Sequence, residues 1–212
     1  MNALFFDTET TGLPNFKLPI NHPDQPHIVQ LAAILADENG DIKAEMNFII
    51  KPDNWTIPPE VSKIHGITTG DAIEFGIPIA MALNIFMEMY KKADYLVAHN
   101  IDFDIRMLRR YSRDLSKNIF ENGETVNFCT MKNMIDVCKL ELTDKQKNSQ
   151  KNSNGWSPPG GWPKYKSPTL SEAYWHLFSD PLDGAHNAMV DVKACHGIFY
   201  EIYENNNQSS NT

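Results

Sequence analysis

The stretch FFDTETTG, residues 5–12, joins two phenylalanines to two carboxylates, Asp7 and Glu9. With Ala3 and Leu4 before it, the run is apolar on both faces, which predicts a short strand in the middle of a sheet. Side chains alternate between the two faces of a strand, so Asp7 and Glu9 share a face with Phe5. We expect them at or just past the C-terminal end of this strand, an edge where sites are common in α/β sheets.

The remaining chain is a succession of predicted strands and helices. After the first strand, two more surround an Asn-Gly turn at residues 38–41, and short strands are expected at residues 95–100 and 126–130. Helices are predicted at residues 58–68, 78–92, 102–115, 131–140, 169–178 and 188–204. This order favours an α/β or α+β layer fold.

Residues 143–167 are polar and rich in Gly, Pro, Asn and Ser, and we expect them to form a flexible loop. Basic and aromatic residues are interleaved in it: Lys145, Lys147, Lys151, Trp156, Trp162, Lys164, Tyr165 and Lys166. Such a mixture can bind single strands by charge and stacking, but a solvated linker is an equally good interpretation. We expect one domain over residues 1–205, followed by a disordered tail over residues 206–212.

Composition excludes several classes of protein. The 212 residues, 42% of them hydrophobic, suit one globular domain. No apolar run approaches the roughly 18–20 residues of a membrane span, and no secretory signal is evident, so no membrane partner is expected. The three cysteines contain no CxxC pair and are interpreted as reduced thiols of a cytoplasmic protein.

The charge is unevenly distributed along the chain. The net charge is −8, yet residues 91–166 hold 14 of the 19 lysines and arginines and only 9 of the 27 acidic residues. Because binding of phosphates depends on the local field, this asymmetry permits a nucleic-acid partner. A solvated basic face explains the charge pattern equally well.

Two further aspartates lie on apolar helix stripes. Asp104 precedes Leu108, Tyr111 and Leu115 by four, seven and eleven residues, so it falls on their face, whereas Arg106, Arg109, Arg110 and Arg113 form a predicted solvated face. Asp191 stands in the same relation to Cys195, Ile198 and Ile202. Both aspartates are therefore expected to point inward near a helix start.

Four inward carboxylates require cations. Singly, each helix-start aspartate is explained by the helix dipole, worth roughly 0.3–1 kcal/mol. Together the four would repel one another and be costly to desolvate. The flanking sequence offers no inward Lys or Arg by period, and hard divalent ions take carboxylate oxygens. The sequence therefore favours one or two Mg²⁺ or Mn²⁺ ions.

His186 adds a proton acceptor to this set. It lies five residues before Asp191, just ahead of the predicted helix. A neutral imidazole there can take a proton from an attacking water. A capping or surface histidine is the alternative interpretation of the residue on its own.

These residues closely resemble the DEDDh exonucleases, the DnaQ-like group that includes the proofreading subunit of bacterial replicative DNA polymerase. The three motifs are similar to FDTETTGLP with Asp7 and Glu9, AHNIDFDIRML with Asp104, and HNAMVD with His186 and Asp191. The stretches PPEVSKIHGIT and KYKSPTLSEAY resemble family segments between the motifs. The resemblance runs in order from residue 5 to about residue 195.

The resemblance implies a ribonuclease H-like α/β fold, with a five-stranded mixed sheet flanked by helices, and a 3′–5′ exonuclease that releases nucleoside 5′-monophosphates. It implies two divalent ions held by Asp7, Glu9, Asp104 and Asp191, with His186 as the general base. Two such ions about 3.5–4 Å apart can activate water and stabilise the leaving oxygen. Substrate contacts implied in the same way are Thr8, Thr10, Leu13, His65, Asn100 and Phe103, with Leu13 wedged between bases.

Three functions remain open at this level. The leading hypothesis is an exonuclease for single-stranded or frayed 3′ ends of DNA, and the second is an exoribonuclease, because nothing reads the 2′-hydroxyl clearly. The third is a non-catalytic nucleic-acid-binding module on the same fold. The polar tail shows no clamp- or polymerase-binding peptide, so a free-standing enzyme is expected, monomeric or homodimeric. Repair is one possible pathway among several.

Overall fold

The computed structural model describes residues 1–111, 125–151 and 161–209. At its centre is a five-stranded sheet in the order β3-β2-β1-β4-β5. The strands are β1 Ala3–Thr10, β2 Ile28–Ala36, β3 Ile42–Ile49, β4 Tyr95–Ala98 and β5 Val126–Cys129. The first strand is central, as its apolar faces predict, and the predicted α/β fold with a five-stranded sheet is confirmed.

The sheet is mixed because the chain direction changes after the first hairpin. β1 runs antiparallel to β2 and parallel to β4, while β3 is antiparallel to β2 and β5 is parallel to β4. Gly40, with φ 84°, makes the predicted turn between β2 and β3. Asp37 stabilises this turn, because its Oδ1 accepts hydrogen bonds from the backbone of Asn39 and Asp41 at 3.0 and 3.1 Å.

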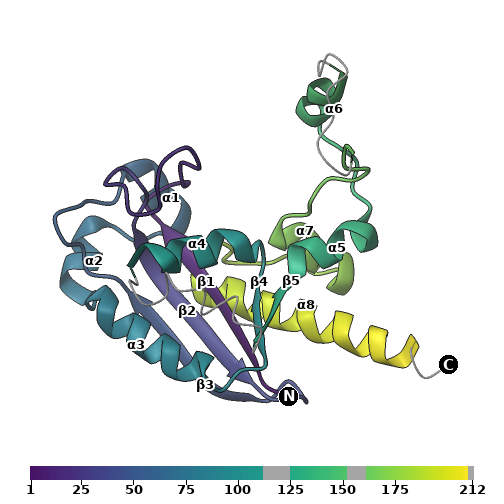
Figure 1. Cartoon of the computed structure of the whole chain (residues 1–212), viewed down its shortest axis with the longest axis horizontal. Coiled ribbons are helices and arrows are strands. Elements are labelled where there is room, and N and C mark those ends of the chain that lie inside the picture. Colours follow the sequence, from purple (N-terminus) through teal and green to yellow (C-terminus); the bar gives the residue numbers. More distant parts are fainter. Residues whose placement is uncertain (112–124, 152–160, 210–212) are drawn as a thin grey trace.

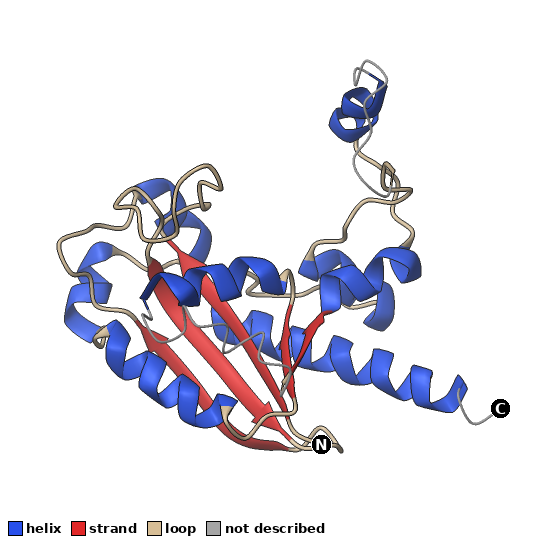
Figure 2. Cartoon of the chain, viewed as in Figure 1, coloured by secondary structure: helices blue, strands red, loops and turns tan. Residues whose placement is uncertain are grey.

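Helices cover both faces of the sheet (Figures 1 and 2). On one face Phe6 packs against Phe86 of α3 (Ile79–Tyr90), and α4 (Ile101–Tyr111) joins the same core. On the other face Phe5 packs edge-on against Phe199 of α8 (Ala188–Ser209). Successive side chains of β1 thus pack into two separate cores, one on each face of the sheet. This packing fixes the orientation of the strand between the two helix layers.

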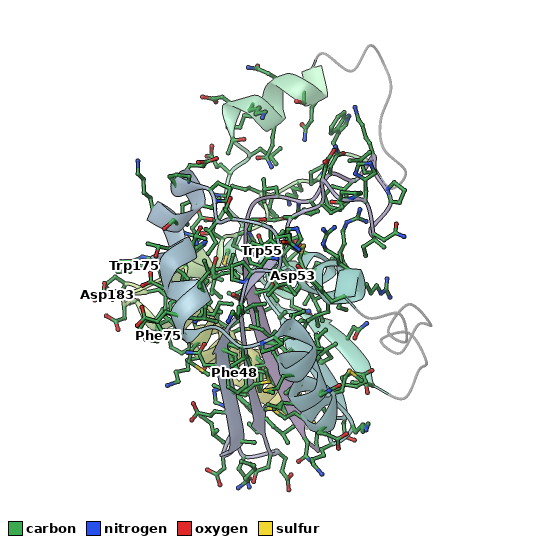
Figure 3. The ribbon with its side chains drawn as sticks, turned by 90° about the vertical axis from the view of Figure 1, so that its left-hand side faces the viewer. Phe48, Asp53, Trp55, Phe75, Trp175 and Asp183 are labelled. Atoms are coloured by element: carbon green, nitrogen blue, oxygen red, sulfur yellow. The ribbon has the colours of Figure 1, made fainter. Side chains whose placement is uncertain are left out.

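The shorter helices lie around this sandwich. They are α1 Pro59–His65, α2 Thr69–Phe75, α5 Thr130–Cys138, α6 Asp144–Lys151 and α7 Leu170–Phe178. Helix α2 was not predicted from the sequence, although Thr68 and Asp71 form a capping box at its start. A small core of Val29, Ile57, Ile67 and Ala72 holds α2 and the segments around it at the start of β2. Trp55 packs against this core and stacks on the ring of His27; Figure 3 labels Trp55.

The predicted flexible loop at residues 143–167 contains a helix, so that expectation is wrong for its first part. Thr143 and Gln146 exchange hydrogen bonds in a capping box, the local signal that starts α6. The helix projects away from the body of the molecule (Figure 1). Residues 152–160, including Trp156, lie outside the described part of the chain. At the C-terminus α8 continues to Ser209, four residues into the predicted tail.

The predicted solvated arginine face of α4 is also wrong. Arg106 donates to the carbonyl oxygens of Asn15 (3.5 Å) and Leu18 (3.3 Å), and Arg110 donates to that of His22 (2.7 Å). These oxygens belong to the connection between β1 and β2, residues 11–27. The arginines thus hold that loop against the helix, while Arg113 lies outside the described residues.

None of the helices in the described ranges combines the length and the apolar character needed to cross a membrane.

Candidate active site

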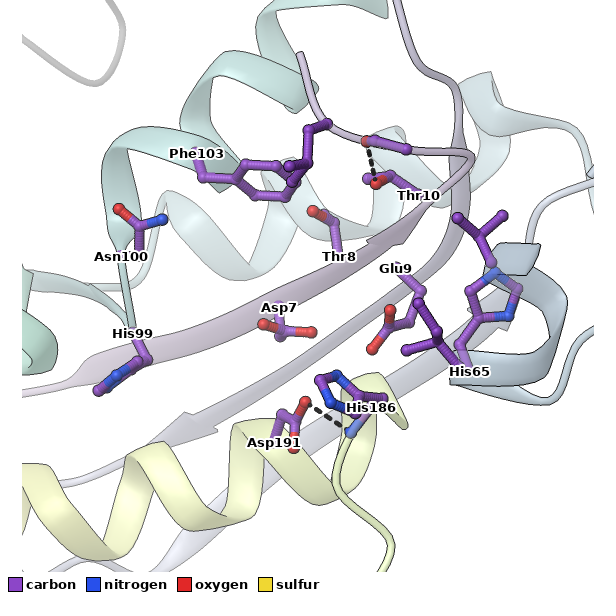
Figure 4. A pocket seen from close by; sticks show the side chains of 14 residues that line it. Asp7, Thr8, Glu9, Thr10, His65, His99, Asn100, Phe103, His186 and Asp191 are labelled. Atoms are coloured by element: carbon purple, nitrogen blue, oxygen red, sulfur yellow. Dashed lines mark hydrogen bonds between the residues drawn. The ribbon is translucent and has the colours of Figure 1, made fainter. Parts of the chain in front are cut away.

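The C-terminal half of β1 brings its two carboxylates to one end of the sheet (Figure 4). Asp7 and Glu9 lie on the face covered by α8, the face that also carries Phe5. Thr8 and Thr10 alternate with them and are buried on the side of α4. One strand therefore presents two acids on one face of the sheet and two threonines on the other, and all four residues line the pocket.

Asp104 approaches the same strand from α4. Its carboxyl group is 2% exposed, and Leu108 one turn later is fully buried, as the apolar stripe predicts; Tyr111 is partly buried and Leu115 lies outside the described residues. Its Oδ1 accepts two hydrogen bonds from Thr8, from the backbone nitrogen at 3.0 Å and from the hydroxyl at 2.8 Å. These bonds fix the carboxyl group against Thr8, the neighbour of Asp7 on β1.

Asp191 and His186 come from the start of α8. His186 has a φ of 69°, in the left-handed region, and its backbone nitrogen donates to Oδ2 of Asp191 at 3.1 Å. Its exposed imidazole lies over the pocket near Glu9 (Figure 4). Oδ1 of Asp191 is buried and has no hydrogen-bond partner among the described residues.

Gln30 fixes this end of α8 to the sheet, a role that no sequence motif indicates. Its side chain is 3% exposed, and its Oε1 accepts a hydrogen bond from Ala188 N at 3.1 Å. Its Nε2 donates to Oδ1 of Asn47 at 2.8 Å. Gln30 also lies opposite Glu9 in the pairing of β1 and β2. It is therefore a positioning residue for the segment that carries His186.

Gln30→Leu is expected to lower the free energy of unfolding by about 1–3 kcal/mol, because the buried Ala188 nitrogen loses its acceptor. Urea unfolding measures this change, and the rate on a nucleic-acid substrate should fall with it. Gln150→Leu on α6 is the control, because the partly buried Gln150 donates a single weak hydrogen bond, to the Pro163 carbonyl oxygen at 3.3 Å, and its loss should change both quantities far less. Unchanged stability in Gln30→Leu would contradict the assigned contact.

The four acids form no ion pair with lysine or arginine in the described part of the chain. Burial, followed by repulsion from Asp104, Asp191 and Glu9, raises the pKa of Asp7 well above its ordinary value. Burial first, and then the neighbouring aspartates, raises the pKa of Glu9 to about 8. Burial also raises the pKa of Asp104 to about 7 and that of Asp191 to about 6. The site is thus poised to bind positive charge.

These side chains fit a divalent metal ion. Ligand atoms of Glu9, His186 and Asp191 lie within 4.8 Å of one another, and Asp7 adds a carboxylate beside them. The buried Oδ1 of Asp191 still needs a partner. Since buried polar atoms are nearly always satisfied and carboxylate oxygens are the preferred ligands of Mg²⁺ and Mn²⁺, a cation explains both features.

Metal-free protein is expected to lose stability as the pH rises from about 5 to 8.5. The raised pKa of Glu9, about 8, means that the folded state binds more protons than the unfolded state across this range, so the free energy of unfolding falls with pH. Thermal unfolding in EDTA at each pH measures the trend, and Mn²⁺ at pH 8.5 should reverse it. Glu9→Gln should flatten the curve, and an equally steep curve in that variant would exclude Glu9 as its source.

A pocket of about 500 Å³ opens in front of the acids. It brings together every substrate-contact residue named from the sequence, which are Thr8, Thr10, Leu13, His65, Asn100 and Phe103. Leu13 is 87% exposed, so it projects into the opening. His65 is 7% exposed; its Nδ1 accepts from Ile67 N at 3.1 Å, and its Nε2 has no partner within the described ranges.

Four pocket residues were not predicted from the sequence: Val61, Ile64, His99 and Gly12. The first two belong to α1, whose position over the sheet end no local pattern reveals. His99 follows β4 and lies 3.0 Å from both the Thr130 hydroxyl and the Pro168 carbonyl oxygen. It joins the wall of the pocket to the segment that leads into α7. Its place next to Asn100 in the second motif was the available signal.

The fold, the four acids and His186 agree with a match to the RNase T exonuclease family over residues 4–199. The chain belongs to this DnaQ-like family and is an exonuclease, a phosphodiester hydrolase. Exonucleases of this family use divalent metal ions.

Two curated relatives and two solved structures show how this chain relates to particular proteins. The DNA polymerase III subunit epsilon of Treponema pallidum is 36% identical over 195 residues, which are 92% of this chain and 73% of that protein. A DNA polymerase III subunit epsilon-like protein of Rhodobacter capsulatus is 32% identical over 122 residues, covering 58% of this chain and 16% of that one.

Exonuclease I structures share the fold. The E. coli enzyme in complex with a dT13 oligonucleotide superimposes with a TM-score of 0.60 at 21% identity, covering 95% of this chain and 40% of that one. The enzyme from Methylocaldum szegediense gives 0.62 at 20% identity, covering 96% and 40%. The chain thus spans about two fifths of these structures, and the predicted ribonuclease H-like fold is confirmed.

Proposed function

We propose that this site removes nucleotides one at a time from the 3′ end of single-stranded or frayed DNA, as nucleoside 5′-monophosphates. The observation that carries the proposal is the convergence of Asp7, Glu9, Asp191 and His186 at one pocket. Asp104 lies outside the described lining of that pocket, but it is close enough to raise the pKa of Asp7, and no basic residue of the described chain forms an ion pair with any of the four acids. A phosphodiester brings negative charge to this acidic site, so catalysis there depends on cations.

Mg²⁺ or Mn²⁺ would be held by Asp7, Glu9 and Asp191, with Asp104 supporting a second ion from behind Asp7. When bound, a pair of such ions supplies charge stabilisation at the attacking and leaving oxygens. The carboxylates of β1 and α8, by holding such ions, would determine where the negatively charged scissile phosphate binds. The two bonds from Thr8 oppose the effect of burial on the pKa of Asp104, which nevertheless stays raised, at about 7.

His186 takes the proton of the attacking water in this proposal. The imidazole lies at the mouth of the pocket. The backbone of His186 is in the left-handed conformation, and its nitrogen donates a hydrogen bond to Oδ2 of Asp191 at 3.1 Å. The oxygen of water then attacks the phosphorus atom, and the bond to the 3′ oxygen of the preceding nucleotide breaks. A general base contributes typically 10²–10⁴-fold to such a step.

The wall of the pocket selects an unstacked terminal nucleotide. Leu13 would separate the last base from its neighbour, and Phe103 and Asn100 would contact the nucleotide from α4 and the turn before it. Nε2 of His65 is free to donate a hydrogen bond into the pocket, since Nδ1 already accepts one. A base inside a duplex would have to leave its stack to enter, so single strands and frayed ends are preferred.

DNA is the favoured substrate over RNA because the curated relatives are subunits of, or are named after, a DNA polymerase, and exonuclease I binds oligodeoxynucleotides in its solved structures. An exoribonuclease is the second candidate. A non-catalytic binding module is disfavoured by the complete set of five residues.

One assay separates these functions. Single-stranded DNA and RNA of equal sequence, labelled at the 5′ end, are incubated with the protein and Mg²⁺ or Mn²⁺. Shortening from the 3′ end on DNA supports the proposal, and shortening of RNA alone supports the second candidate. Binding without cleavage, unchanged by EDTA, would overturn both enzymatic functions.

We also propose that residues 1–205 act as one exonuclease domain in the cytoplasm, as a monomer or homodimer. Residues of β1 and α8, far apart in the sequence, build one pocket, which supports a single domain. Cys129, Cys138 and Cys195 are buried with free thiols, which suits a reducing compartment.

A further inference from the structure

A second hollow is lined in part by the same two elements as the active-site pocket, the loop after β1 and α4. Its volume is about 240 Å³, and its lining residues are Phe16, Ile20, Asp102, Ile105, Arg106, Arg109 and Asn127. The loop after β1 supplies Leu13 to the pocket and Phe16 to the hollow. In the same way α4 supplies Phe103 to the pocket and Arg106 to the hollow. The members of each pair are three positions apart in the sequence. For the pair on α4 this is less than one helical turn of 5.4 Å.

Phe16 presents an open aromatic face in this hollow. The side chain is 75% exposed, although burying a phenylalanine is normally favourable. The guanidinium carbon of Arg106 lies 4.9 Å from the ring centroid, so one face is covered by a cation–π contact. With three quarters of the side chain exposed, the second face remains free to stack.

The loop that carries Phe16 is held by a buried glutamine. Gln25, 4% exposed, donates to the carbonyl oxygens of Asn15 (2.8 Å), Leu18 (3.1 Å) and Pro19 (3.1 Å), and its Oε1 accepts from Asn15 N at 3.0 Å. Arg106 contacts the same segment. The exposed ring therefore stands on a fixed support, which lowers the entropy cost of stacking a ligand on it.

The charges at the hollow suit a phosphate backbone. Arg106 and Arg109 both line it, and guanidinium groups match phosphate oxygens. The one carboxylate in the lining, Asp102, is paired with Lys132 at 2.6 Å. An aromatic platform beside arginines is the combination with which proteins bind single-stranded nucleic acids without reading their sequence.

We propose that this hollow is a second nucleotide subsite, in which a base upstream of the 3′-terminal nucleotide stacks on Phe16 while its phosphate meets the arginines. The strand would leave the active-site pocket over the edge formed by Leu13 and Phe16. The inference rests on the proposed function, since it assigns the next part of the same substrate. It predicts that affinity grows when the substrate is longer than its terminal nucleotide.

The test compares two substrates in wild type and Phe16→Ala. The p-nitrophenyl ester of thymidine 5′-monophosphate fills only the terminal pocket, whereas an oligothymidylate of twelve nucleotides reaches the hollow. The ratio of KM values, oligonucleotide over ester, should rise roughly 5- to 150-fold in Phe16→Ala, the effect of one lost base stack. Phe16→Trp should restore the wild-type ratio, and kcat should change little.

Phe75→Ala is the matched control, because Phe75 is 65% exposed on α2 and lines neither hollow (Figure 3). It should leave the ratio at its wild-type value. An unchanged ratio in Phe16→Ala would overturn the subsite, as would an equal loss on both substrates, which would make Phe16 a support of the catalytic pocket.

If wild type hydrolyses neither substrate, the proposed function fails, and fluorescence anisotropy of a labelled oligothymidylate in Ca²⁺ decides the subsite separately. Weaker binding by Phe16→Ala supports the subsite there. Equal binding by Phe16→Ala and wild type would overturn the subsite.

Discussion

Asp7→Asn is expected to lower the exonuclease rate at least about 10³-fold and to leave the fold intact. Asp7 is the acid nearest the centre of the cluster, because burial and all three other acids raise its pKa. Losing its charge removes a ligand between the proposed ions, and a factor of 10³ corresponds to about 4 kcal/mol of transition-state stabilisation. The rate on 5′-labelled single-stranded DNA in Mg²⁺ measures the effect.

The same substitution should stabilise the metal-free protein at pH 8, because it relieves repulsion within a cluster that lacks cations. Thermal unfolding in EDTA tests this expectation. Asp53→Asn, at an exposed position outside the pocket lining, is the matched control and should change neither rate nor stability (Figure 3). A fully active Asp7→Asn protein would remove Asp7 from the mechanism.

His186→Gln should lower kcat by about 10²- to 10⁴-fold, the usual contribution of a general base. Affinity for Mn²⁺, measured by calorimetry, should change far less, because the carboxylates supply the main ligands. His176→Gln, exposed on α7, is the control with the same change of side chain.

The alternative role of His186 has a different signature. Its ring nitrogens lie close enough to Glu9 and Asp191 for all three to bind one ion. A large loss of Mn²⁺ affinity in His186→Gln, with a rate restored by excess metal, would therefore make the histidine a ligand and not a base.

The catalytic set could be predicted from the sequence because each member obeys a local period. Alternation along β1 places Asp7 and Glu9 on one face, and the apolar stripes of two helices turn Asp104 and Asp191 inward. The prediction was possible because each acid occupies a position that the period of its own strand or helix assigns to a buried apolar residue. Such a mismatch can be seen within one segment of sequence. Motif order then identified the family.

The supports of the site could not be predicted in the same way, because they join distant segments. Gln30 contacts Ala188, 158 residues away, and Arg106 binds a loop some 90 residues earlier. An arginine stripe on a helix is compatible with solvent and with a loop packed against it, and only the fold decides between them. The capping box at Thr143 was a readable signal for α6 that polar composition concealed.

The most direct measurement of the central claim is anomalous diffraction from crystals grown with Mn²⁺ and thymidine 5′-monophosphate. The account predicts manganese peaks bounded by the carboxylates of Asp7, Glu9 and Asp191, with the phosphate of the nucleotide on the same ions and its base beside Leu13. Manganese bound elsewhere, with Asp7, Glu9 and Asp191 left without an ion in the presence of nucleotide, would contradict the account.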